Sequence, residues 1–137
     1  MANWYTRGAF EIGSGGTVWT TSSMRVALVT STYTFSKAHN LANQITNEVT
    51  GGGYARATIA SPTTSENDAS TRVEYDATDT AFTNITGTNV NAAIILRTTG
   101  SDSTSPLIWY VDFTAQSPAA ADLTLQWSSS GIAHLTN

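Results

Sequence analysis

The 137-residue chain contains no cysteine and few charged residues. Without cysteine it can form neither a disulfide framework nor a thiolate metal site. Charged side chains make up 12% of the residues, about half the share in an average globular protein. The formal net charge is −4, and the six arginines and lysines are scattered along the chain. No basic stripe is therefore present to follow a phosphate backbone, and we expect no nucleic-acid partner.

The sequence also lacks an apolar run of the roughly 20 residues that a membrane-spanning helix needs. Its first residues lack the charged and apolar regions of a signal peptide. We therefore expect neither a membrane partner nor export. The length corresponds to one domain by the usual relation of length to domain number, and no repeat or linker divides the chain. We expect a single domain over residues 1–137.

Polar character comes instead from Ser, Thr and Asn, and the chain has 24 threonines. β-Branched side chains are stiff and fit the pleated surface of a sheet, so this composition favours strands over helices. A β-rich surface with few charges is common in extracellular domains and in viral shell proteins, where flat polar faces contact other proteins or sugars.

Two apolar runs, residues 92–96 and 107–113, are expected at the centre of the fold. A strand that is apolar on nearly both faces is usually central in its sheet. In the second run the odd-numbered residues from Leu107 to Phe113 should point to one face and the even-numbered residues to the other. The two runs predict long antiparallel strands joined by an exposed loop over residues 98–105.

Alternating apolar and polar residues predict further short strands at residues 24–30, 54–60, 72–76, 82–85, 123–127 and 132–136. An exposed loop is expected at residues 61–70 and a turn around Pro118 at residues 116–122. Many short strands separated by turns predict an all-β fold, an antiparallel β-sandwich of jelly-roll-like type.

One short helix is expected at residues 36–45, which break the alternating pattern. Ala38, Leu41, Ala42 and Ile45 recur at the spacing of one helix face. Ser36 is a suitable N-cap. At the start of the chain, residues 1–12 mix aromatic and small residues, which fits either an N-terminal arm or another short helix.

The sequence offers no set of residues at the spacing that metal binding needs. His39 and His134 lie far apart, and neither has a second ligand nearby, whereas a zinc site needs three or four convergent ligands. Asp76 and Asp79 resemble part of a calcium site, but the alternating ligands closed by a bidentate Glu are missing. We expect no metal and no cofactor.

The sequence also shows no set of residues at the spacing that catalysis needs. Asp112 lies inside an apolar strand, where burial would raise the pKa of its carboxyl. Glycoside hydrolysis needs a second acid, and none stands at a suitable position. A structural role for Asp112, either capping backbone groups or pairing with an arginine such as Arg97, is the preferred interpretation, and we expect that the protein is not an enzyme.

The four tryptophans exceed what core packing requires. Trp109 and Trp127 fall on apolar strand faces and are expected in the core. Tryptophans near the start would suit an interface, because a few buried aromatics often dominate binding, and exposed ones would also suit stacking on a sugar. The candidate interface residues are Trp4, Tyr5, Phe10 and Trp19.

Six segments that span nearly the whole chain resemble a known family: MANWYTRGAF, RVALVTSTYTFSKAH, ITNEVTGGGYA, DATDTAFTNITGT, AIILRTTGSDSTSPLIWYVDF and LTLQWSSSGI. Together they are similar to small structural proteins of tailed bacteriophages. The resemblance implies a virion protein, a capsid cement or decoration protein on the capsid surface, assembled in the host cytoplasm. The implied partners are the major capsid protein and copies of the chain itself in a homo-oligomer such as a trimer. It implies no catalytic residues.

Two other hypotheses stay open. A tail or head-fibre module that binds host-surface glycans predicts exposed tryptophans and a measurable affinity for sugar. A hydrolase predicts two acids that face one cleft.

Overall fold

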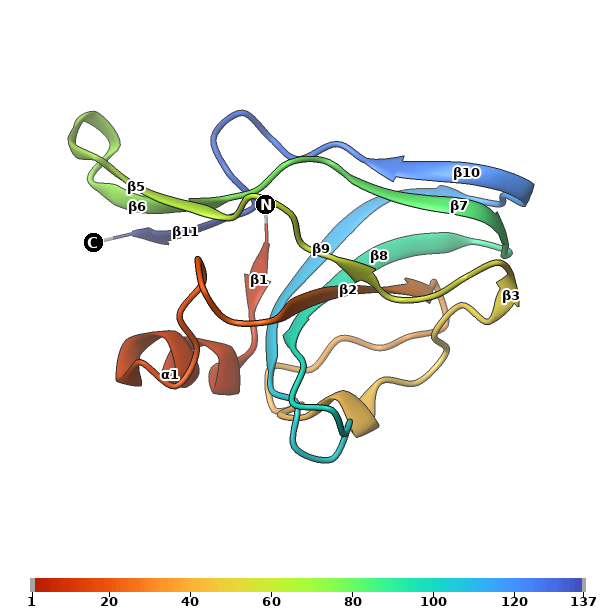
Figure 1. The fold of residues 1–137 in the computed structure, drawn as a ribbon, viewed down its shortest axis with the longest axis horizontal. Coiled ribbons are helices and arrows are strands. Elements are labelled where there is room, and N and C mark those ends of the chain that lie inside the picture. The colour runs from red at the N-terminus through yellow and green to blue at the C-terminus, as the bar shows by residue number, and fades with distance from the viewer. Residues whose placement is uncertain (1, 137) are drawn as a thin grey trace.

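A five-stranded antiparallel sheet forms the centre of the computed structural model, which describes residues 2–136 (Figure 1). Its neighbours in order are β1 (Asn3–Trp4), β9 (Leu107–Gln116), β8 (Val90–Arg97), β2 (Met24–Thr30) and β4 (Ala57–Thr58). Strands β8 and β9 are the two long strands expected from the apolar runs, and they pair directly with each other. The sequence therefore located the central pair correctly.

Two three-stranded sheets complete the strand framework. One has the order β10 (Ala119–Leu125), β7 (Thr80–Thr86) and β3 (Gly51–Gly52), and it lies over one face of the central sheet (Figure 1). The other has the order β11 (Ala133–Thr136), β6 (Arg72–Asp76) and β5 (Thr63–Asn67), and it projects beyond the sandwich at one end. The predicted all-β sandwich is confirmed, with 46% of the chain in strands.

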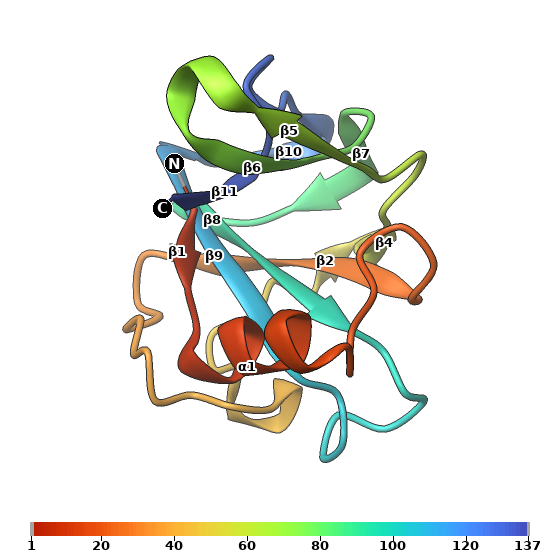
Figure 2. The same ribbon diagram turned by 90° about the vertical axis from the view of Figure 1, so that its left-hand side faces the viewer.

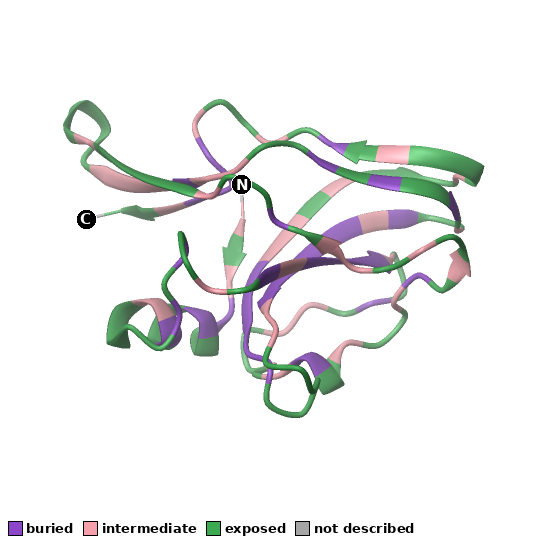
Figure 3. Cartoon of the chain, viewed as in Figure 1, coloured by how far each residue is buried: buried purple, intermediate pink, exposed green. Residues whose placement is uncertain are grey.

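The middle strands of the central sheet, β8 and β2, are buried on both faces (Figure 3). The first core lies between the central sheet and the two smaller sheets, and it includes Val26, Leu28, Ile95 and Trp109. The second core lies on the opposite face of the same strands and is built from Ala27, Val29, Ile94, Leu96 and other residues, including Tyr33 from the segment after β2. Alternate residues of β2 and β8 thus feed two different cores, which explains why both strands read as nearly continuous apolar runs.

A β-bulge shifts the predicted alternation at the start of β9. Leu96 pairs with Leu107, whereas the preceding residue of β8, Ile95, pairs with Trp109, so Ile108 is the extra residue. Leu107 consequently joins the second core, while Ile108 and Trp109 both join the first. The prediction that Leu107 shares a face with Trp109 is wrong because strict alternation does not allow for a bulge.

The α-helix lies near the start of the chain, α1 (Thr6–Ser14). It packs against β9 through Gly8, where an added Cβ would overlap the backbone of Ile108. The Tyr5 amide donates to the Ile108 carbonyl at 3.1 Å, which holds the helix start against the bulge. Gly15, with φ at 77°, ends the helix in the left-handed conformation that glycine adopts without strain.

The helix predicted at residues 36–45 is wrong. Only a single 3₁₀ turn, η1 (Ala42–Gln44), forms there, and Leu41 is extended and bridges to Pro106. The Leu107 amide donates to the Asn40 carbonyl at 3.0 Å, and the Ala42 amide donates to the Ser105 carbonyl at 2.9 Å. The segment therefore pairs its backbone with the loop between β8 and β9, and helix hydrogen bonds cannot form at the same time.

Three other segments differ from expectation. The region of residues 61–70 is exposed as predicted, but it forms strand β5 and a 3₁₀ turn, η2 (Asp68–Ser70), because it pairs with β6. The expected turn at residues 116–122 is shorter, since β9 and β10 extend into it and leave only Ser117 and Pro118 between them. Of the strand expected at residues 54–60, only Ala57–Thr58 pairs with β2.

Candidate functional site

Three of the four aromatic residues predicted at an interface lie in or against the core. Tyr5 is fully buried and Trp19 is 3% exposed. Trp4 is half-buried, and its ring centroid lies 5.1 Å from that of Trp109. The Trp4 indole Nε1 donates to the His134 carbonyl at 3.0 Å, which ties β1 to β11. In this conformation these three side chains pack on their own chain. The prediction of Tyr5 and Trp19 as partner contacts is corrected because both are buried, whereas Trp4, which is half-buried, stays a prediction.

Phe10 is the one candidate aromatic that faces solvent. Its side chain is 62% exposed on α1, and the Arg7 guanidinium carbon lies 5.6 Å from the ring centroid. A cation over an aromatic face is attracted by the ring quadrupole. Arg7 also binds Glu11 at 2.7 Å on the same helix, so the exposed part of α1 presents an apolar ring beside a fixed positive group.

A pocket of about 490 Å³ lies on the projecting sheet β11–β6–β5, and we call it the end pocket. Its apolar part comes from Val73 on β6 and Leu135 on β11, which are directly paired, and Leu135 is 53% exposed. Acidic side chains, Glu66 and Asp68, stand at its border. Arg72 also lines the pocket, but it is paired with Glu74 at 2.7 Å. The end pocket therefore has an apolar floor and an acidic border.

The end pocket and α1 lie at the same end of the molecule. Figure 2 faces this end and shows α1 below and the sheet of β5, β6 and β11 above. Of the three large apolar side chains that are clearly exposed in residues 2–136, Phe10 and Leu135 belong to these two elements, and Val18 lies in the turn after α1. Phe10 and Leu135 are therefore the candidate contact residues at this end of the molecule.

A second depression, of about 430 Å³, lies between β9 and β10 and includes Phe113, Leu123 and Trp127. These strands follow each other in the chain but belong to different sheets. Polar residues such as Gln116 and Gln126 also line it. Trp127 is half-buried there, and its Nε1 donates to Thr80 Oγ1 at 3.2 Å. The expectation that Trp127 belongs wholly to the core is thus only partly met, whereas Trp109 is fully buried.

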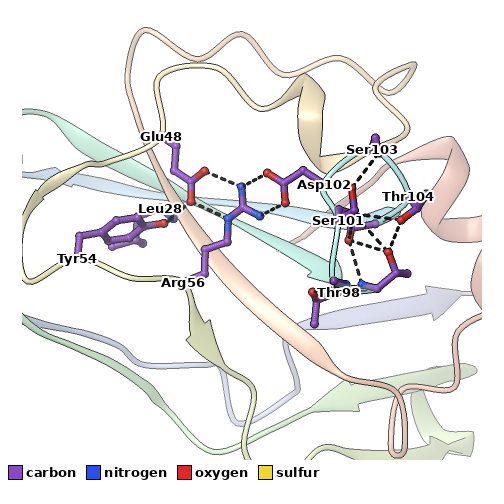
Figure 4. Close-up of polar contacts among 12 residues, drawn as sticks. Leu28, Glu48, Tyr54, Arg56, Thr98, Ser101, Asp102, Ser103 and Thr104 are labelled. Carbon is purple, nitrogen blue, oxygen red and sulfur yellow. Dashed lines mark hydrogen bonds and ion pairs between the residues drawn. The ribbon is translucent and has the colours of Figure 1, made fainter.

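The main charged cluster places Arg56 between two carboxylates (Figure 4). Arg56 donates to both oxygens of Glu48 at 2.8 and 2.7 Å, and to both oxygens of Asp102 at 2.7 and 3.0 Å. These hydrogen bonds, chiefly those to Glu48, raise the pKa of the guanidinium. Tyr54 donates to Glu48 at 2.7 Å and accepts from the Leu28 amide at 3.0 Å. Because Arg56 binds both carboxylates in bidentate fashion, the cluster is suited to hold chain segments together rather than to transfer protons.

Asp102 belongs to a Ser- and Thr-rich loop between β8 and β9 that is held by its own hydrogen bonds (Figure 4). Ser105 Oγ donates to the Ser101 carbonyl at 2.7 Å, and the hydroxyls of Ser101 and Ser103 are 2.9 Å apart. The Asn43 amide donates to the Asp102 carbonyl at 3.2 Å. The Arg56 cluster therefore fixes this exposed loop to the segments on either side of it.

A second carboxylate, that of Glu11, is buried beside two arginines. Arg7 binds it at 2.7 Å and Arg97 at 3.3 Å, and Glu11 is 3% exposed. Pairing with Arg97, one of the two structural roles expected for Asp112, does not occur. Asp112 is exposed and lies opposite Ala92, near the other end of β8 from Arg97.

Two tyrosines, Tyr5 and Tyr54, have a raised pKa because their side chains are buried. Burial raises the pKa of Tyr5, and its hydrogen bond with Tyr33 at 2.9 Å adds to this effect. Burial likewise raises the pKa of Tyr54, with the Glu48 charge as the next cause. Both hydroxyls are bonded to other protein groups, so their role is to satisfy polar atoms inside the fold.

The two histidines, His39 and His134, contact different groups in the structure. His39 Nδ1 is 2.9 Å from the Tyr33 hydroxyl, and His134 Nε2 is 2.6 Å from the Ser130 carbonyl. Within residues 2–136, no group of three or more His, Cys, Asp and Glu side chains is arranged to hold a metal ion. The same residues include no helix long and apolar enough to cross a bilayer.

The sequence did not reveal the end pocket. Leu135 was assigned to a closing strand and Glu66 to a loop, and the pairing of β11 with β6 and of β6 with β5 brings them together. The sequence carries no local signal for this pocket, because both the exposure of Leu135 and the strand pairing depend on the fold. Comparisons of the chain with family models, with curated proteins and with solved structures found no match.

Proposed function

We propose that this protein is a non-enzymatic structural protein of a bacteriophage virion, a capsid cement or decoration protein that binds the assembled head and stabilises it. The observation that supports this most directly is the end surface formed by Phe10 on α1 and by the end pocket with Leu135. A few exposed aromatic and aliphatic anchors in a polar setting are typical of protein interfaces.

The rest of the molecule suits a role in which shape matters more than chemistry. The low proportion of charged residues, 12%, lets broad Ser- and Thr-rich faces approach a neighbour with little cost of removing water from ions. Weak individual contacts become effective on a symmetric lattice, because each one raises the effective concentration of the next. The proposed partners are the major capsid protein and copies of this chain in a symmetric oligomer.

Reconstitution on particles tests the proposal. Particles prepared without this protein are mixed with increasing amounts of purified protein, and the bound amount and the temperature of particle rupture are measured. Saturable binding at many sites with a raised rupture temperature is expected. Phe10→Asp should lower the affinity for the particle, whereas absence of binding by the unaltered protein contradicts the proposal.

A second candidate function is a tail or head-fibre module that binds host-surface glycans. The depression between β9 and β10 favours it, because Trp127 and Phe113 lie there beside Gln116 and Gln126. Aromatic rings and amide side chains are the groups that pack on sugar rings and bond their hydroxyls. Binding to a glycan panel that is lost in Trp127→Ala would support this function, and binding to no glycan would remove it.

A further inference from the structure

The end surface contains two features that match each other. Phe10 on α1 is an exposed apolar projection, and the end pocket has an apolar floor of Val73 and Leu135. None of the residues that line the end pocket belongs to α1, so within residues 2–136 the helix does not fill the pocket of its own chain. The chain therefore presents both a projection and a depression of the same apolar character.

The charges around these two features are also opposite. Glu66 and Asp68 border the end pocket and form no ion pair among the described residues. On α1 itself, Arg7 is 43% exposed but paired with Glu11 at 2.7 Å. The exposed Lys37 lies beside the helix start, where its carbonyl accepts a hydrogen bond from the Thr6 amide at 3.0 Å, and it forms no ion pair among the described residues. Opposite charges across an interface guide association and fix its register.

We propose that the end pocket is the binding site for α1 of a second copy of this chain, with Phe10 packed on the paired side chains of Val73 and Leu135 of the partner copy. Because α1 and the projecting sheet lie at the same end (Figure 2), a two-fold axis through this end brings each helix to the other pocket. Such a contact is isologous, so every favourable interaction occurs twice. Lys37 of one copy then faces Glu66 and Asp68 of the other, while Arg7 stays paired with Glu11 of its own chain.

This inference adds to the proposed function the contact by which two copies associate. It rests on the proposed function only where it places the pair of copies on the phage shell. The pair itself forms in solution. Phe10 then affects particle binding by joining two copies, because a pair holds the lattice through two contacts at once. The loop between β8 and β9 and the sheet β10–β7–β3 lie outside the contact between copies and are free to meet the shell.

Sedimentation velocity of the full chain over a range of concentrations tests the inference. The unaltered protein is expected to be a dimer at high concentration and to dissociate on dilution. Phe10→Asp and Leu135→Asp each remove an anchor of about 2 kcal/mol at both symmetric contacts, so each should weaken the dimer by about 700-fold. Val18→Asp is the matched control, because Val18 is also 48% exposed but lines neither feature, and it should leave the dimer unchanged.

Exchanging the charges of Asp68 and Lys37 distinguishes specific docking from nonspecific association. Asp68→Lys should weaken the dimer, and adding Lys37→Glu to the same chain should restore it. Both side chains are exposed, so these variants should fold, which circular dichroism checks. A monomer at all concentrations, a trimer, or equal weakening by Val18→Asp and Phe10→Asp overturns the inference. A monomer that still saturates the particle leaves the proposed function intact, and a dimer that does not bind the particle leaves this inference intact.

Discussion

Replacement of Trp109 probes the centre of the first core. Trp109 is fully buried, and its ring centroid lies 4.9 Å from that of Trp19, 5.1 Å from that of Trp4 and 5.3 Å from that of Tyr75. Its ring thus packs against β1 of the same sheet, the turn after α1 and the projecting sheet. Trp109→Ala removes all of these contacts at once and leaves a cavity.

The expected loss for Trp109→Ala is about 3–5 kcal/mol of unfolding free energy, the usual cost of truncating a large buried aromatic. For a chain of 137 residues, the typical unfolding entropy per residue converts this into a fall in Tm of about 10–17 °C. Trp109→Phe should cost less than half as much. The Trp109 Nε1 is buried and has no hydrogen-bond partner among the described residues, so phenylalanine also removes an unpaired donor that is costly to bury.

Urea denaturation followed by far-UV circular dichroism measures both variants without depending on tryptophan fluorescence. Trp127→Ala is the control, because Trp127 is only half-buried, and it should cost less than Trp109→Ala. An unchanged midpoint for Trp109→Ala, or a larger loss for Trp109→Phe than for Trp109→Ala, would refute this description of the core.

Three further predictions concern backbone packing, pH and the charged cluster. Gly8→Ala should destabilise the protein, because a Cβ there overlaps the backbone of β9, whereas Gly13→Ala on the same helix meets no atom within 4 Å and should stabilise it by about 0.5–1 kcal/mol; equal effects in thermal unfolding contradict the packing of α1. Burial raises the pKa of Tyr5 and Tyr54 above 10.0, so the unfolded chain releases these protons first and stability should fall above about pH 10. Tyr5→Phe should flatten this fall by up to about 1.4 kcal/mol per pH unit in urea titrations, and an unchanged slope speaks against burial of the hydroxyl. Arg56→Gln should cost about 1–3 kcal/mol and speed hydrogen exchange in the loop between β8 and β9, while unaltered exchange shows that the cluster does not hold that loop.

The sequence predicted the parts of the fold that depend on local patterns. The apolar runs identified β8 and β9, and clean alternation identified β6 with its bounds. Local patterns failed where distant backbone groups decide the conformation. Residues 36–45 have helical spacing, but Leu41 pairs with Pro106 instead, and Ile108 forms a bulge that no apolar count reveals.

The candidate site was harder to predict for the same reason. Aromatic residues near the chain start were expected to face a partner, yet Tyr5 and Trp19 complete the cores of their own chain. A sequence shows that an aromatic side chain favours burial, but it does not show whether the same chain or a partner buries it. Phe10 stays uncovered and Leu135 joins it at the same end, because β11 pairs with β6 rather than with the central sheet.

The measurement that tests the proposed function most directly is a particle reconstruction that locates this protein and counts its copies. The proposal predicts density for the β-sandwich at many symmetry-related positions on the outside of the head. It also predicts that particles carrying Phe10→Asp show reduced occupancy at those positions. Density confined to the tail, or only a handful of copies per particle, would contradict a cement protein and favour the fibre module instead.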